Sequence, residues 1–432
     1  MPAMVVSACK THLKKLDVVQ NMALRICTGA FKTSPVESLH VDSGVLPLSI
    51  RREKLGLRYV LKAMSSKSNP NYKHVKQPID RAPNRPSLPK PLEVRLSDSS
   101  REVGLAPTGV AEIICPKFPP WCLPPVEICP IRHFKRNNSV EQLRTKFVDH
   151  RYHQHSNKAI FTDGSKTSHG VGFAVIAEDK IVKKKLSDIC SVFTAEMHAV
   201  ISAVKHIFAS AGNESSFTIF TDSQSILSSL KKMVPDNILV QELRQWIMLL
   251  QTRKNIKISF CWVPAHVGVR GNELADEAAK EASQVGGFFI GNIPLKDFKR
   301  KIDNFISNKW QVQWDILNSN FKLKSIRPSV LPWKSCHEDR RSSIVLTRLR
   351  IGHTFYTHKY LMTSGVERQA PQCPTCNITI SVKHILVECP RYELIRRANF
   401  LSNKLLGEIL GENAHLDHIV QFLKDISIFY DI

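Results

Sequence analysis

The alternation of apolar and polar positions changes abruptly at Lys158, where short apolar runs begin to follow one another. These runs occupy residues 159–165, 171–178, 181–188, 217–222 and 256–264. Their β-branched and aromatic side chains favour strands, and short turns separate the first three runs. We therefore expect five strands, of which the first three form an antiparallel meander.

Between and after these strands, apolar residues recur at spacings of three and four, which is typical of helices. In residues 193–210 this face consists of Met197, Val200, Ile201, Val204, Ile207 and Phe208. Three more helical stretches lie at 223–233, 238–253 and 271–283. The resulting order, βββαβααβα, predicts one α/β domain in residues 158–285, with a mixed five-stranded sheet that carries helices on its faces.

The regions on either side of this domain have different patterns. Residues 1–75 are predicted to be helical, since one helical face would carry Leu16, Val19, Met22, Ala23 and Ile26. Residues 76–150 form a predicted linker, because 12 of the 24 prolines lie between Pro78 and Pro130. Residues 290–432 are again predicted to be helical and basic, and they contain a cluster of Cys and His at 373–389.

Composition limits the class of protein. A chain of 432 residues with 43% hydrophobic residues is long enough for two or three domains and at least one substantial core. No run approaches the roughly 18 apolar residues of a membrane span, and lysines interrupt the N-terminal apolar run, so we expect no membrane segment and no signal peptide. The 11 cysteines are an odd number, which favours a reducing intracellular compartment, nucleus or cytoplasm, over a disulfide framework.

The net charge of +23 indicates a polyanionic partner. Nucleic acid is the first candidate, although a membrane surface or an acidic protein would require the same sign of charge. Residues 158–285 hold 15 Lys plus Arg against 13 Asp plus Glu, so most of the excess positive charge lies in the flanks. We therefore expect the flanks to supply the electrostatic attraction.

Four acids stand at informative positions in the predicted domain. Asp163 lies within the first strand and Asp222 ends the fourth, whereas Glu196 is expected in the first turn of a helix and Asp276 in the first turns of the last helix. Each of them alone could be a turn or capping residue. Four converging carboxylates, however, repel one another unless cations neutralise them, and hard oxygen ligands suit Mg²⁺.

The motifs FTDGS, TAEMHAV, FTDSQSIL and WVPAHVGVRGNELADEAA, in this order, resemble the RNase H type 1 family. The resemblance covers residues 158–285, under a third of the chain, and implies an RNase H-like fold and cleavage of the RNA strand of RNA–DNA hybrids. It implies that Asp163 and Asp222 bind two Mg²⁺ or Mn²⁺ ions. Glu196 would serve the ion on the leaving-group side, Asp276 would serve the ion that activates water, and His266 would assist proton movement or product release.

Contacts with the hybrid are also implied by motif position. The candidates are Gly164, Ser165, Ser223 and Gln224. RNA would be distinguished from DNA by its 2′ hydroxyls in the minor groove. Turn formation and helix capping are equally good explanations for these four residues, and an ordinary surface role is the alternative for His266.

A second candidate site lies near the C-terminus. Cys373, Cys376, His384 and Cys389 follow the pattern Cys-x2-Cys-x7-His-x4-Cys, which supplies four ligands for a tetrahedral structural Zn²⁺. Unliganded cysteines in a reducing compartment are the alternative. Ligand spacing is lacking at the other cysteines, which are Cys9, Cys27, Cys115, Cys122, Cys129, Cys190, Cys261 and Cys336.

Two flanking segments, 19–52 and 346–362 with the cysteine box after it, resemble parts of non-LTR retrotransposon polyproteins. The family carries a reverse transcriptase upstream, but this sequence has no Asp-Asp motif of the polymerase kind. The resemblance therefore implies a truncated product without polymerase activity. It also implies removal of template RNA after reverse transcription as the role of the nuclease.

Two other functions remain open. The chain could be a nucleic-acid-binding relic that has kept the fold and lost turnover, although all four acids and His266 are present. It could also be a transposase or integrase, which is disfavoured because the Glu comes between the two strand aspartates and a fourth acid follows in NELAD. The sequence indicates no membrane partner and leaves the oligomeric state open.

Overall fold

The computed structural model describes residues 9–76, 92–105, 110–112, 119, 122–129, 139–153, 157–178, 180–212, 215–232, 235, 237–285, 287–288, 293–317, 321–333, 339–362 and 369–432. Cys115, Cys336 and much of the predicted linker at 76–150 lie outside these residues. The chain divides into unit 1, which contains Met1–Tyr59, Asp80–Leu96 and Ile302–Ile432, and unit 2, which contains Val60–Ile79 and Ser97–Lys301. None of the described helices is both long enough and apolar enough to cross a membrane.

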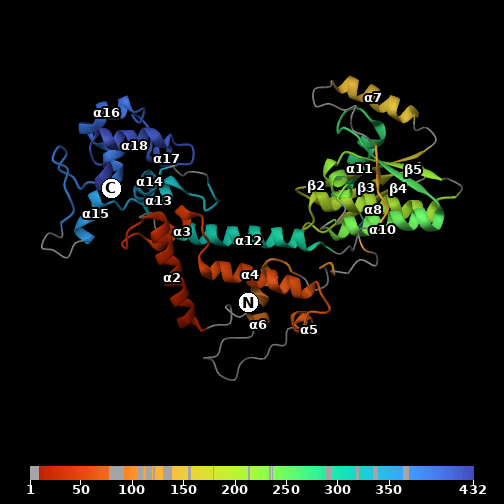
Figure 1. Cartoon of the computed structure of the whole chain (residues 1–432), viewed down its shortest axis with the longest axis horizontal. Coiled ribbons are helices and arrows are strands. Elements are labelled where there is room, and N and C mark those ends of the chain that lie inside the picture. Colours follow the sequence, from red (N-terminus) through yellow and green to blue (C-terminus); the bar gives the residue numbers. More distant parts are fainter. Residues whose placement is uncertain are drawn as a thin grey trace. The chain divides into compact units, whose positions relative to one another are not determined.

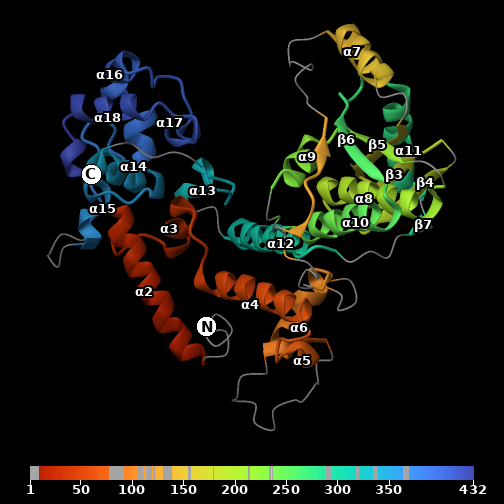
Figure 2. The same ribbon diagram turned by 45° about the vertical axis from the view of Figure 1, so that its right-hand side comes forward.

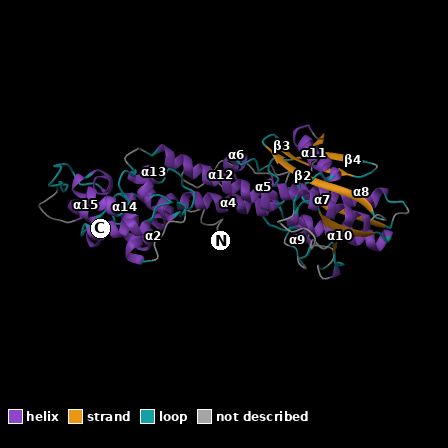
Figure 3. Ribbon diagram, turned by 90° about the horizontal axis from the view of Figure 1, so that it is seen from above, coloured by secondary structure: helices purple, strands orange, loops and turns teal. Residues whose placement is uncertain are grey.

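All described strands belong to unit 2 and form one mixed sheet (Figures 1 and 3). The five predicted strands are β2 (Lys158–Thr167), β3 (Gly170–Ile176), β4 (Ile181–Leu186), β5 (Ser216–Thr221) and β6 (Lys257–Trp262). The first three form the expected antiparallel meander, and β5 lies parallel to both β2 and β6. Two-residue strands, β1 (Glu127–Ile128) and β7 (Gly287–Phe288), extend the sheet to the order β1-β6-β5-β2-β3-β4-β7.

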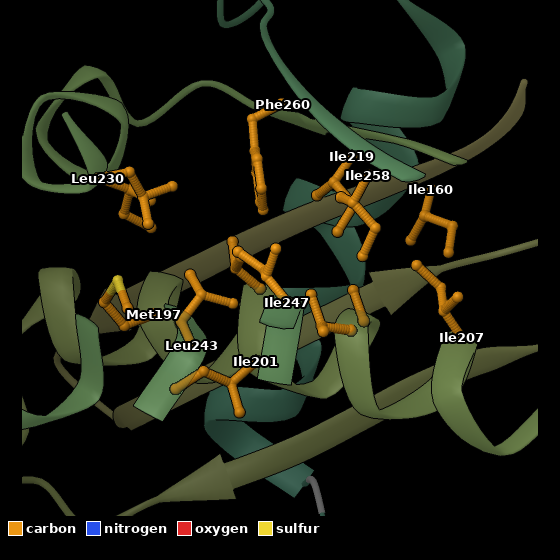
Figure 4. Close-up of a cluster of buried hydrophobic side chains, with 14 of the residues drawn as sticks. Ile160, Met197, Ile201, Ile207, Ile219, Leu230, Leu243, Ile247, Ile258 and Phe260 are labelled. Atoms are coloured by element: carbon orange, nitrogen blue, oxygen red, sulfur yellow. The ribbon is translucent and has the colours of Figure 1, made fainter. Parts of the chain in front are cut away.

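Helices cover both faces of this sheet. One face packs against α8 (Val192–Ser210), α9 (Gln224–Leu230) and α10 (Ile238–Lys254), and the core there includes Met197, Ile219, Leu243, Ile247 and Phe260 (Figure 4). The opposite face packs against α11 (Arg270–Val285), whose small Ala278 and Ala279 lie against Ala174. The predicted element order βββαβααβα and the α/β class are therefore confirmed.

A further helix, α7 (Val140–His153), precedes the predicted domain and packs on the same face as α11. Its Phe147 lies edge-on to Phe220 of β5, with ring centroids 5.3 Å apart, and 6.4 Å from the ring of Phe161 in β2. The same cluster contains Val267 and Val269, which lie on either side of Gly268 in the loop between β6 and α11. The compact α/β body thus begins before Lys158.

Unit 2 also contains two short helical segments and the start of a long helix. These elements are α5 (Tyr72–Lys76), the later part of α6 (Leu92–Glu102) and the first residues of α12 (Leu295–Ile316). An isolated parallel bridge joins Val110 to Ile293. Helix α12 therefore begins within unit 2, after the end of α11.

Unit 1 contains no strand among its described residues, in agreement with the helical pattern of both flanks (Figure 2). The N-terminal part forms α2 (Lys10–Thr28), α3 (Val36–Ser43) and most of α4 (Leu48–Met64). The C-terminal part comprises the rest of α12 from Ile302 onward, the helices α13 (Lys322–Ile326), α14 (Arg340–Ile351), α15 (Phe355–Met362), α16 (Glu393–Ala398), α17 (Leu406–Leu410) and α18 (Leu416–Asp425), the π-helix η3 (His384–Glu388), and the 3-10 helices η4 (Pro390–Tyr392) and η5 (Phe429–Asp431). Their core includes Leu346, Leu386 and Phe422.

The helical face predicted in α2 is not a buried one. Leu16, Val19, Met22 and Ile26 are between 44% and 74% exposed. Leu24, which does not belong to that face of the helix, is buried. The spacing of apolar residues therefore predicted the helix correctly but did not identify the side that packs.

Many arginines of unit 1 donate hydrogen bonds to backbone carbonyls. Arg348 Nε reaches Gly29 O at 2.8 Å, Arg350 Nε reaches Leu410 O at 3.0 Å, and Arg327 Nη2 reaches Leu331 O at 2.7 Å. Arg340, Arg341 and Arg396 make bonds of the same kind. Because buried carbonyls need donors, these guanidinium groups satisfy the ends of helices and loops.

Candidate active site

The register between β2 and β5 places two of the four acids side by side. Thr162 pairs with Thr221, so the next residues along the two parallel strands are Asp163 and Asp222. Asp163 lies within β2 and is 8% exposed, and Asp222 directly follows the last residue of β5. The indole nitrogen of Trp262 donates to the backbone oxygen of Asp222 at 2.9 Å and thereby holds the end of β5.

Glu196 approaches these aspartates from α8. The expectation that it lies in the first turn is wrong: the helix begins at Val192, and its first turn contains no acid. Gly164 allows the close approach, because a Cβ at this position would overlap the backbone of Ala195 and Glu196. The hydroxyl of Ser223 donates to Glu196 Oε2 at 2.5 Å and so orients the carboxylate.

Asp276 approaches from α11 on the opposite face of the sheet. It lies on the second turn, since the helix begins at Arg270 and its first-turn acid is Glu273. Lys280, one turn further along, donates to Asp276 Oδ2 at 2.7 Å. The Nδ1 atom of His266 is 3.9 Å from the same oxygen.

His266 lies in the loop between β6 and α11. Its backbone has a φ of 55°, and its side chain is 74% exposed. The loop is anchored directly after the histidine: Val267 is buried, and Gly268 N donates to Glu273 Oε1 at 2.9 Å. The imidazole therefore faces solvent from a held loop and lies next to Asp276.

The carboxylates disfavour one another's ionisation. Burial raises the pKa of Asp163 to about 7, with further contributions from Asp222, Asp276 and Glu196. Burial also raises the pKa of Glu196, which the Ser223 hydroxyl opposes, and that of Asp222, which His266 opposes. Such mutual destabilisation of anions is relieved by a bound cation.

This set of ligands fits magnesium. All four acids offer oxygen, the ligand that Mg²⁺ prefers, and they reach one edge of the sheet from two strands and two helices. Asp163 and Asp222 lie at the centre and could bind ions on either side. Glu196 and Asp276 come from opposite faces, so each would contribute to a different ion. The arrangement could activate a water molecule and stabilise a leaving oxygen.

The four candidates for substrate contact lie beside the acids, Gly164 and Ser165 within β2, Ser223 between β5 and α9, and Gln224 at the start of α9. Ser165 is half-buried and Gln224 is exposed. Gly164 packs against α8, and Ser223 caps α9 by accepting a hydrogen bond from Ile226 N at 3.4 Å. Helix capping, one of the structural roles considered from the sequence, is therefore present at Ser223, whereas Gly164 lies within β2 and forms no turn. Contact of any of the four with substrate stays a prediction.

The four residues of the cysteine box come together in unit 1. The ligand atoms of Cys373, Cys376, His384 and Cys389 all lie within 4.8 Å of one another, the one such group of three or more potential ligands in the described part of the chain. The carboxylates of unit 2 are spread more widely than this. The cysteine box therefore has the compact geometry of a metal centre.

His384 supplies the strongest sign that the box needs a ligand. Its ring is 2% exposed, and neither ring nitrogen has a hydrogen-bond partner of normal geometry. The ring nevertheless lies close enough to Cys373 to lower the pKa of that thiol to about 6, together with the N–H of Cys376. Arg396 donates to the carbonyl of Cys389 at 2.7 Å and thereby holds the backbone of this cysteine in place. No disulfide joins the described cysteines.

Several residues that hold the acids have no role indicated by the sequence motifs. Lys280 was detectable, because it lies four residues after Asp276 on the same helix. Trp262 acts through its indole N–H on a backbone atom, and sequence patterns do not reveal such contacts. Asp297 bonds to the start of α8 over a separation of 103 residues, which no local signal indicates.

Comparisons with known proteins agree on this domain. Residues 155–284 match the family model for RNase H. The Pol polyprotein of Equine infectious anemia virus (strain Wyoming) is 29% identical over 131 residues, which are 29% of this chain and 10% of that protein. The chain thus spans about a tenth of the length of this curated relative.

Solved structures similar to this chain include two RNase H1 enzymes. The one from the halophilic archaeon Halobacterium salinarum NRC-1 is 18% identical, with a TM-score of 0.22, and the match covers 29% of this chain and 96% of that one. LC11-RNase H1, solved in complex with an RNA/DNA hybrid, is 18% identical, with a TM-score of 0.23, and the match covers 29% and 97%.

Proposed function

We propose that this chain, whose residues 155–284 form an RNase H domain, cleaves the RNA strand of RNA–DNA hybrids. The observation that carries the proposal is the meeting of four acids on neighbouring elements. Asp163 in β2 and Asp222 directly after β5 lie side by side, and α8 and α11 bring Glu196 and Asp276 to the same place. The raised pKa values of Asp163, Glu196 and Asp222 support a site that is completed by cations.

Hydrolysis of the phosphodiester requires a deprotonated water on one side and stabilisation of the leaving 3′ oxygen on the other. Two Mg²⁺ ions, or Mn²⁺ in their place, would supply both. Asp163 and Asp222 would bind both ions, Glu196 would complete the site on the leaving-group side, and Asp276 would complete it on the water side. The protein itself contributes no nucleophile.

His266 would move the proton. Its Nδ1 atom lies 3.9 Å from Asp276 and its ring is open to solvent, so it can pass a proton between the water side of the site and bulk water. Selection of RNA would come from contacts with 2′ hydroxyls. Ser165 and Gln224 have the accessible side chains for such contacts, and Gly164 and Ser223 could contribute through their backbones.

The test uses the full chain with a labelled RNA–DNA hybrid in Mg²⁺. We expect the wild type to cut the RNA strand, Asp222→Asn to abolish cutting, and the matched variant Asp188→Asn, at an exposed aspartate of the same domain, to cut normally. Hybrid binding without cutting by the wild type would indicate the nucleic-acid-binding relic. Joining of DNA ends would indicate a transposase or integrase.

We propose secondly that Cys373, Cys376, His384 and Cys389 bind a structural Zn²⁺. The orphaned nitrogens of buried His384 support this, because a tetrahedral zinc would bind one of them. We expect purified protein to contain one zinc, Cys389→Ser to lose it and melt at a lower temperature, and Cys122→Ser, at an exposed cysteine outside the box, to keep it. Wild-type protein that folds and contains no zinc would exclude the site.

We also propose an origin in a non-LTR retrotransposon polyprotein. The support is the resemblance of residues 19–52 and 346–362 to such polyproteins. Similarity to a retroviral Pol polyprotein is weak and extends over 131 residues. Neither the nuclease proposal nor the zinc proposal depends on this origin.

A further inference from the structure

An acid outside the family match is buried against the helix that carries Glu196. Asp297 belongs to the first turn of α12, beyond the matched residues 155–284, and is 3% exposed. A buried carboxylate is costly unless it is bonded, and all its described partners lie in unit 2. Arg300, one turn further along α12, donates to Asp297 Oδ1 at 3.0 Å.

The other oxygen of Asp297 bonds to the start of α8. Oδ2 accepts from the backbone N–H of Ser191 at 3.0 Å and from the hydroxyl of Thr194 at 2.6 Å. Ser191 in turn caps α8, since its Oγ accepts from Thr194 N at 3.2 Å. Asp297 therefore reinforces the cap of α8 from a distant part of the chain.

The first turn of α8 has little freedom in the direction of the active site. Thr194 lies two residues before Glu196 in this turn. The backbone of Ala195 and Glu196 packs so closely on Gly164 of β2 that no space for a Cβ is left between them. Ser223 then holds the carboxylate of Glu196 at the other end. A change in the cap would therefore move Glu196 relative to Asp163 and Asp222 rather than be absorbed by loose packing.

We propose that Asp297 is a positioning residue for Glu196. It holds the first turn of α8 so that the Glu196 carboxylate keeps its place beside Asp163 and Asp222. The role of Glu196 as a metal ligand rests on the proposed function. The contact of Asp297 with α8 does not, and the two can be tested separately.

The experiment compares the full wild-type chain with Asp297→Ala, Asp297→Asn and Asp315→Ala. Asp315 lies on the same helix, α12, and its described side-chain partner is Gln311 of that helix, so its variant is the matched control. Two measurements need no catalysis: hydrogen exchange of the amides at 191–197, and Mg²⁺ binding by calorimetry. Cleavage of a labelled hybrid then gives kcat and KM.

We expect Asp297→Ala to exchange faster at 191–197 and to bind Mg²⁺ about 10-fold more weakly, as is typical when a residue that orients a metal ligand is removed. The loss should appear in kcat, with KM for the hybrid unchanged. Asp297→Asn should recover most of the affinity, because its amide oxygen can accept both hydrogen bonds. Asp315→Ala should behave as wild type.

A lower melting temperature of Asp297→Ala with Mg²⁺ affinity and kcat unchanged would show a role in stability only and would overturn the proposal. If Asp297→Ala does not fold, Thr194→Val removes one of the two bonds, and normal Mg²⁺ binding by that variant would overturn the proposal equally. Wild-type protein that binds Mg²⁺ but does not cut would refute the nuclease function and leave the exchange and binding results to decide the role of Asp297.

Discussion

Asp163 links the electrostatics of the site to stability. Burial and the neighbouring acids raise its pKa from 3.8 to about 7, so the folded state favours the protonated form. The stability that this group contributes is fully present below pH 3.8 and is lost as pH rises to about 7. Without metal, the folded protein at neutral pH therefore contains a carboxylate whose ionisation opposes folding.

We predict that Asp163→Asn melts at a higher temperature than the wild type in EDTA, by several degrees at pH 7.5 and by less at pH 5. The neutral amide removes the cost of ionising a buried group, and this cost grows between these pH values. Thermal unfolding in EDTA at both pH values is the measurement, with Asp188→Asn as the control. A difference that is the same at both pH values would refute this explanation.

Lys280 affects the same site with the opposite charge. Its ammonium group bonds to Asp276 Oδ2 at 2.7 Å and would compete with a cation for that oxygen. We predict that Lys280→Gln reaches half-maximal cleavage at a Mg²⁺ concentration several-fold below that of the wild type. A Mg²⁺ titration of the cleavage rate measures this, and Lys257→Gln, at an exposed lysine of β6, should leave the titration unchanged.

Among single residues, the four acids are recognisable from their sequence motifs, but the side chains that hold them in place are not. Asp163 and Asp222 were detectable because one lies within an apolar strand pattern and the other at the end of one, which places both on the sheet. Asp297 was not, because its bond to Thr194 depends on how α12 returns to α8 over 103 residues. Local patterns carry no information on such contacts.

At the scale of elements, α7 shows that the family match and the folded body have different limits. The match begins at residue 155, but Phe147 of α7 packs on Phe161 and Phe220 of the sheet. Val267 and Val269, on either side of Gly268, belong to the same cluster. The helix therefore supports both the sheet and the loop that carries His266.

We predict that Phe147→Ala lowers the free energy of unfolding of unit 2 by about 3–5 kcal/mol, the usual loss for a buried Phe truncated to Ala. Val148→Ala, at an exposed neighbour on the same helix, should change it by less than about 0.5 kcal/mol. Chemical denaturation followed by circular dichroism measures both. Equal effects of the two substitutions would mean that α7 does not pack on the sheet in solution.

The predictability of elements follows from their length. The five long strands and the helices α8, α10 and α11 each carry enough residues for a period to appear, and all of them were predicted. The two-residue strands β1 and β7 have no period, so the sheet was predicted too narrow. In α2 the period was correct but the buried side was not predicted, because an apolar face does not indicate which neighbour covers it.

At the scale of the whole molecule, the positive charge has two uses. The net charge of +23 predicted attraction of nucleic acid, yet several arginines of unit 1 are bonded to carbonyls of their own unit. Arg350, for example, is 3% exposed and lies over the ring of Trp333 at 4.9 Å. Part of the basic composition therefore maintains the fold rather than a phosphate-binding surface.

We predict that Arg350→Lys destabilises unit 1 by about 1.5–3 kcal/mol, because lysine lacks the planar group that bonds to Leu410 O and covers Trp333. Hybrid affinity at moderate salt should not change. Denaturation and a binding titration test the two statements, and Lys14→Gln, at an exposed cation of the same unit, is the control for stability. A drop in affinity without loss of stability would assign Arg350 to the binding surface.

Unit 1 is assembled from both ends of the chain, with the nuclease domain between them. Gly29 and Cys27, at the end of α2, receive hydrogen bonds from Arg348 and Arg340, which are more than 300 positions later in the sequence. During translation, α2 is synthesised long before the arginines that bond to it, so unit 1 cannot be completed until they emerge. Unit 2 can fold as soon as it leaves the ribosome. At about 5–20 residues per second the delay is roughly 15–60 s. Throughout that interval the N-terminal helices depend on chaperones or on their own solubility to avoid aggregation.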